Sequence, residues 1–299
     1  MSQSLQQAYQ YSLKIVNLLP EHLKNVKAIK NPEKYIYIAK DSDEFLTFYR
    51  DSLMESFIQE EIDNNLSTDI LDILGIEDQE NYLDSVLEKI KSQEKKKYIK
   101  KAEKHIDEIY NNNLDLAKQT TGGVYNLFTG YICLNPFCEK NDKNLNAKDF
   151  YIWTIIHELA HAIHIEVYKE KDSVLNKFLT LYWLSFFLPN KIFLKGMDIY
   201  QIKELLKKQL VSTQRSDEDS STNKFIRNDL LGIKINDLQT IINIKMEDNI
   251  PTRYAHSAPQ ELWAESFALF TISNKDAKLL MPNMYDFICK EILQEGDLK

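Results

Sequence analysis

The chain has 299 residues, of which 43% are hydrophobic, and it carries a formal net charge of −8 at pH 7. That length is enough to bury a sizeable core, and the negative charge argues against broad binding to a phosphate backbone, so no nucleic-acid partner is expected. Three cysteines are too few for a disulfide scaffold. Seven glycines and seven prolines are few for this length, which favours helices over a many-turned β fold.

The first part of the chain, residues 1–115, is expected to form a helical N-terminal region. Its apolar residues recur at helical spacing, and only residues 35–38 have the β-branched and aromatic composition of a short strand. The N-terminus lacks the basic start and apolar core of a secretory signal, so the default expectation is a cytoplasmic protein, or one delivered by a signal-independent secretion route. The most apolar run, residues 178–188, falls short of the about 20 residues that a transmembrane helix needs.

Composition changes at residue 120, where a turn signal precedes an aromatic and β-branched segment. Residues 124–134 predict one or two strands, and a helix is expected from residue 147 onward. Residues 116–299 are expected to form the catalytic region, interrupted by a helical insertion at about 170–250. The predicted fold class is therefore α+β, mostly helical, with a small sheet.

The strongest motif lies on the helix expected from residue 147. His157-Glu158-Leu159-Ala160-His161 has the HExxH pattern, and residues i and i+4 lie on one face of a helix. Both imidazoles can then reach one tetrahedral zinc ion, while Glu158 lies where its carboxylate can take a proton from a zinc-activated water molecule. The motif therefore predicts a zinc-dependent hydrolase.

A third metal ligand has to come from elsewhere in the chain. The metzincin pattern would place it at Val167, which cannot ligate, and His164 would require the helix to bend. Glu166 lies about 140° around the helix from His161 and is a poor candidate. Glu261 is the best remaining candidate, and Glu265 lies one turn later on the same face, where it can hydrogen-bond a ligating histidine.

Together the two segments resemble a known family. The HExxH motif is followed far downstream by a second set of matching residues: Tyr254, Ala255, Pro259, Glu261, Ala264, Glu265, Phe267 and Ala268. This combination resembles the gluzincin metallopeptidases that include the protease domain of anthrax lethal factor and the Mlc titration factor peptidase. About 100 residues separate the second histidine from Glu261, roughly twice the gap that the family leads us to expect, which indicates the helical insertion.

The resemblance implies a zincin-like catalytic domain with zinc held by His157, His161 and Glu261. It implies Glu158 as the base and Tyr254 as the hydroxyl that stabilises the developing oxyanion. It also implies a substrate strand ahead of the metal helix, at Val124, Tyr125, Asn126, Leu127 and Phe128. We expect free backbone groups on this edge, that of Asn126 among them, to bind the main chain of a peptide.

These features predict a zinc-dependent endopeptidase that acts on a protein or peptide substrate. Two alternatives remain at this point: a regulatory metallopeptidase that cleaves a repressor, and a zinc-binding interaction protein without catalysis. Neither the identity of the substrate nor the oligomeric state is encoded in these motifs.

Overall fold

The computed structural model describes residues 3–65, 119–127, 129–138, 146–169, 173–188, 196–212 and 235–294, together with residues 100, 103, 104 and 194. The chain groups into two compact units, residues 36–144 and residues 2–35 with 145–299. The boundary predicted at residue 115 lies outside the described residues. The described part is mostly helical with one small sheet, which confirms the predicted α+β class.

The first unit contains the sheet and a long helix, α4 (Ser42–Asn65). The strand order is β1 (Ile36–Ile38), β3 (Ile132–Leu134) and β2 (Gly123–Tyr125), with β1 parallel and β2 antiparallel to β3. A cluster of buried side chains packs between sheet and helix: Ala39, Phe45, Leu46 and Cys133. Both strand predictions, the short strand near residue 36 and one or two strands within 124–134, are confirmed.

The turn between β2 and β3 corrects one expectation about the predicted substrate strand. The backbone N–H of Asn126 is not free, because it donates to the Tyr131 carbonyl at 2.8 Å. The Asn126 side chain, which is buried, also accepts from the backbone N–H of Thr129 at 2.8 Å. Gly130 has φ of 75°, which a glycine adopts without strain. Because β2 and β3 are antiparallel, the backbone N–H of Asn126 faces β3 and not the open edge of the sheet.

Two further residues of the predicted substrate strand do not lie in a strand that the structure describes. Leu127 lies in the turn, and Phe128 is outside the described residues.

We therefore expect Asn126→Pro to destabilise the hairpin, whatever binds to the sheet. Proline removes the donor of the hydrogen bond to the Tyr131 carbonyl, at a cost of about 1–3 kcal/mol. Asn126→Ala is the matched control, because it loses the same side chain but keeps the N–H. Urea denaturation should show a lower free energy of unfolding for the proline variant than for the alanine variant. Equal values would contradict the hydrogen bond to Tyr131.

The second unit is built around α8 (Ala147–Val167), which carries the HExxH motif. Asn146 caps this helix by accepting from the backbone N–H of Asp149 at 3.0 Å, as suits an N-cap residue. α1 (Gln3–Val16) packs along α8 and buries Leu5 and Ala8 completely. The chain from α1 to the sheet passes through η1 (Glu21–Asn25), α2 (Lys27–Lys30) and α3 (Pro32–Tyr35). Residues from the predicted N-terminal region therefore cover the metal helix.

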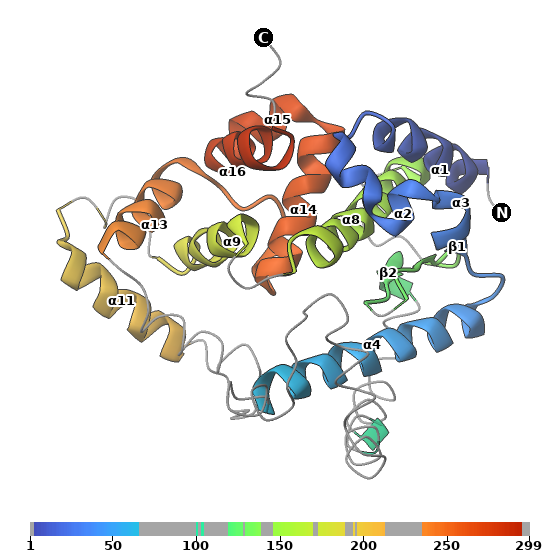
Figure 1. Ribbon diagram of the computed structural model, residues 1–299. Coiled ribbons are helices and arrows are strands. Elements are labelled where there is room, and N and C mark those ends of the chain that lie inside the picture. Colours follow the sequence, from blue (N-terminus) through green and yellow to red (C-terminus); the bar gives the residue numbers. More distant parts are fainter. Residues whose placement is uncertain are drawn as a thin grey trace. The chain divides into compact units, whose positions relative to one another are not determined.

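A second long helix, α14 (Pro259–Ile272), crosses α8, and Figure 1 shows it in orange against the yellow-green of α8. Pro259 stands in its first turn, where the missing N–H costs nothing. Trp263 is fully buried at the crossing, and its indole N–H donates to the Ala160 carbonyl at 2.7 Å. This bond fixes α14 to α8 within the HExxH segment.

Three helices of the predicted insertion are described: α9 (Val174–Ser185), α11 (Ile199–Ser212) and α13 (Ile235–Glu247). α9 packs against both α13 and α14. Its Tyr182 hydroxyl donates to the buried Asp248 carboxylate at 2.8 Å, and that carboxylate also accepts from the backbone of Asn283 and Met284. The insertion is thereby connected to the C-terminal elements.

After the short turn η3 (Tyr254–His256) and α14, the described chain ends in α15 (Asn274–Leu280), α16 (Pro282–Phe287) and η4 (Ile288–Ile292). Within the described residues, none of the helices has the length and apolar character required to cross a membrane. The apolar run that begins at residue 178 belongs mostly to α9, where Leu179, Tyr182 and Trp183 are buried core residues.

Candidate metal centre

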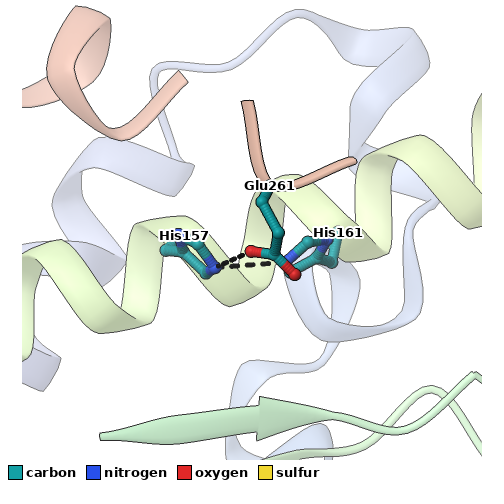
Figure 2. Close-up of side chains that lie close together, drawn as sticks. All are labelled: His157, His161 and Glu261. Carbon is teal, nitrogen blue, oxygen red and sulfur yellow. Dashed lines mark hydrogen bonds and ion pairs between the residues drawn. The ribbon is translucent and has the colours of Figure 1, made fainter. Parts of the chain in front are cut away.

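Three side chains from two helices converge at one point (Figure 2). His157 and His161 stand one turn apart on α8, with their Nε2 atoms 3.1 Å apart. Glu261, in the first turn of α14, places its Oε2 atom 3.2 Å from Nε2 of His157 and 3.4 Å from Nε2 of His161. In the part of the chain that the structure describes, these three residues are the group of histidine, cysteine and acidic side chains that could hold a metal ion.

The separations of these three atoms suit a small metal ion. In a tetrahedral site with bonds of about 2.0–2.1 Å, neighbouring ligand atoms lie about 3.3 Å apart, and the observed values are 3.1–3.4 Å. Glu261 Oε2 is also buried, with the two imidazole Nε2 atoms as its polar neighbours, and a carboxylate oxygen placed there is costly unless a proton or a metal ion lies between these atoms. The site therefore fits a metal ion, although the geometry alone does not choose the element.

Glu265 orients His157 from the other side of the ring. Its Oε1 atom lies 2.8 Å from His157 Nδ1 and accepts from the Trp153 indole N–H at 3.1 Å. The His157 separation is that of a hydrogen bond, but the N–H is poorly aligned with the oxygen, so the attraction is mainly electrostatic. A proton held on Nδ1 leaves the Nε2 lone pair facing the other two ligand atoms. Such support of a ligating histidine is typical of metal sites.

When no metal ion is bound, the carboxylates of Glu261 and Glu265 determine the protonation of His157. Burial opposes a charged imidazole, but Glu261 and Glu265 outweigh it and raise the pKa of His157 to about 10. Burial likewise disfavours an ionised Glu261, yet the neighbouring His161 and His157 hold the pKa of its carboxyl below the ordinary range. Without an ion, the site at neutral pH therefore holds His157 as an imidazolium, with a proton on each ring nitrogen, beside an ionised Glu261. A metal ion would displace the proton on Nε2.

The two rejected candidates on α8 have other partners. His164 Nε2 lies 2.6 Å from the Asn176 side-chain oxygen, and burial lowers the pKa of His164 to about 4. This neutral histidine ties α8 to the start of α9. Glu166 points elsewhere too, because its Oε2 atom accepts from the backbone N–H of Lys27 at 2.8 Å. Both side chains thus serve packing between elements.

Glu158 and Tyr254, the predicted base and oxyanion donor, lie beside the metal ligands. Glu158 follows His157 directly on α8 and is buried. Tyr254, in η3, is 56% exposed, and its ring centroid lies 6.0 Å from that of His157. The predicted substrate strand belongs to the other compact unit, so its role beside the metal centre stays a prediction.

Sequence reasoning missed two tryptophans near this site. Trp153 stands four residues before His157 on α8, the spacing of a same-face neighbour, and this signal could have paired it with Glu265. Trp183 of α9 donates its indole N–H to the His256 carbonyl at 3.3 Å, two residues beyond Tyr254. No sequence pattern links two residues that are so far apart in the chain.

In comparisons with known proteins, no family model, curated protein or solved structure matches the chain. The likeness to gluzincins thus depends on the two motifs described above.

Three glutamates on α8 and α14 allow a matched test of the metal centre. Glu261→Gln should lose most of the bound metal, because an amide is a poor ligand. Glu265→Gln should retain stoichiometric metal but bind it about 10–100-fold more weakly, since it supports His157 only from behind. Glu166→Gln, the same chemical change on a glutamate without access to the centre, should bind metal like the unchanged protein. Titration with Zn²⁺ against a chelating dye distinguishes the three. Unchanged affinity in Glu261→Gln would remove this residue from the ligand set.

Proposed function

We propose that this chain is a zinc-dependent endopeptidase with a zincin-like catalytic region, acting on a protein or peptide substrate. The observation that carries the proposal is the triangle of His157, His161 and Glu261, with Glu158 next to the first ligand. Within the described residues, no fourth histidine, cysteine or acidic side chain joins this group. Three protein ligands leave one tetrahedral position open, which distinguishes catalytic zinc sites from the four-ligand structural sites.

The donor set favours zinc over other biological cations. Two imidazole nitrogens and one carboxylate oxygen at tetrahedral spacing suit Zn²⁺, whereas Mg²⁺ and Ca²⁺ prefer six or more oxygen ligands. Zinc at this position would act as a Lewis acid and would bring the pKa of a coordinated water molecule close to neutrality.

The chain's own residues supply the proton transfers. Glu158 accepts the proton of the attacking water molecule and then returns it to the amine nitrogen as the peptide bond breaks. Glu265 keeps the His157 ring fixed while charge develops. Tyr254 is exposed beside His157, and from there its hydroxyl would donate to the oxyanion of the substrate carbonyl.

Glu158→Gln tests this assignment directly. The variant should keep its zinc, because Glu158 is not a ligand, and should lose about 10²–10⁴-fold in kcat, because an amide cannot accept a proton. Cleavage is measured by mass spectrometry on a degenerate peptide library, with Glu166→Gln as the acid-to-amide control. Equal activity of Glu158→Gln and the unchanged protein would disprove the mechanism. Stoichiometric zinc with no cleavage by the unchanged protein would favour a zinc-binding interaction protein instead.

Tyr254→Phe should lower kcat with little change in KM. The phenol would act on the charge of the transition state rather than on the bound substrate, and one such donor contributes about 2.7–4 kcal/mol. Steady-state kinetics on one peptide from the library, with zinc content measured in parallel, provides the readout. If Tyr254 only packs against His157, phenylalanine preserves the ring and the kinetics stay unchanged.

A further inference from the structure

The turn that carries Tyr254 is held at several points. Within it, the Tyr254 carbonyl accepts from the backbone N–H of Ser257 at 2.9 Å and from its hydroxyl at 2.7 Å. The backbone N–H of Ala255 donates to the Thr252 hydroxyl at 3.2 Å, and the Ala255 side chain is fully buried. These bonds shape the turn, and Thr252 also ties it to α14, because the Thr252 side chain hydrogen-bonds the Glu265 carboxylate.

A second connection comes from the C-terminal end of α9. Trp183, which is 2% exposed, donates its indole N–H to the His256 carbonyl at 3.3 Å. The His256 ring meets Phe186 and Phe187 edge-on, each at a centroid distance of 6.0 Å. Phe187 in turn packs edge-on against Trp183 at 4.5 Å. Backbone and side chain of His256 are thus both held by one helix end.

We propose that Trp183 is a positioning residue, which through His256 fixes the turn that presents Tyr254 beside the metal centre. The indole bond restrains the backbone two residues beyond Tyr254, and the phenylalanines restrain the ring of the same residue. Tyr254 itself is mostly exposed, so the turn rather than side-chain burial determines its position. α9 lies in the segment that was predicted to be an insertion. Under this proposal, the insertion helps to position Tyr254 at the site. The catalytic consequence depends on the proposed function, whereas the positioning does not.

Fluorine NMR tests the position of Tyr254 without any need for activity. The probe is 3-fluorotyrosine, introduced at position 254 by codon suppression. Trp183→Phe removes the indole N–H but keeps an aromatic ring, and it should shift or broaden the fluorine resonance. Ser185→Ala is the control, because it removes a buried hydrogen bond inside α9, from the Ser185 hydroxyl to the Tyr182 carbonyl, and should leave the resonance in place. An unchanged resonance in Trp183→Phe, or an equal change in Ser185→Ala, would overturn the proposal.

His256→Ala covers the case in which Trp183→Phe fails to fold. The His256 side chain is exposed, so its removal should preserve the fold while deleting both phenylalanine contacts, and the resonance should again move. A folded His256→Ala protein with an unchanged resonance would also count against the proposal.

Kinetics then separate positioning from general damage. Trp183→Phe should keep full zinc content and KM while kcat falls about 10- to 100-fold, the range expected when a reacting group is slightly misplaced. A variant that loses zinc or raises KM to the same degree would indicate damage to the fold instead. If the unchanged protein cleaves no peptide, the proposed function fails, and the fluorine resonance still decides the positioning of Tyr254.

Discussion

The crossing of α14 over α8 is the contact on which the candidate site depends. His157 and His161 come from one helix and Glu261 from the other, so a small sliding of one helix would separate the ligand atoms. Trp263 opposes such sliding in two ways, because its buried ring fills the crossing and its indole N–H binds the Ala160 carbonyl within the motif. Loss of a buried tryptophan side chain typically costs about 3–5 kcal/mol. The metal-binding geometry is therefore held by ordinary core packing.

The charge at this crossing is balanced by a proton on His157 when no ion is present, and a metal ion could balance it instead. Glu261 and Glu265 approach His157 from opposite ring nitrogens, and in the ion-free state they keep it protonated with a pKa of about 10. A metal ion would take the place of the Nε2 proton and would lie against the buried Oε2 of Glu261. Glu265 loses nothing in this exchange, because Nδ1 retains its hydrogen. The centre is thus preorganised, with its carboxylates already placed before any ion enters.

The sequence predicted those parts of the site that lie on single helices and failed where partners depend on tertiary contacts. Helical periodicity placed each pair, His157 with His161 and Glu261 with Glu265, on one helix face. The resemblance to gluzincins implied Glu261 as the third ligand, and the structure brings His157, His161 and Glu261 together. The use of the Asn126 donor was predicted wrongly, because strand periodicity does not say which neighbour a backbone N–H faces. The packing of α1 on α8 and the bond from Trp183 to His256 connect distant segments, for which local patterns carry no signal.

The contacts between distant segments explain how His161 and Glu261 can belong to one site although about 100 residues separate them. Doubling the length of a flexible connection costs only about 0.6 kcal/mol in closure entropy, far less than the burial of Trp263 contributes. The described end of the inserted chain is anchored, since Asp248 accepts from the Tyr182 hydroxyl of α9 and from the first residues of α16. The chain therefore leaves the insertion at a fixed point, six residues before Tyr254. A connection anchored in this way delivers Tyr254 and Glu261 to α8 as reliably as a short one.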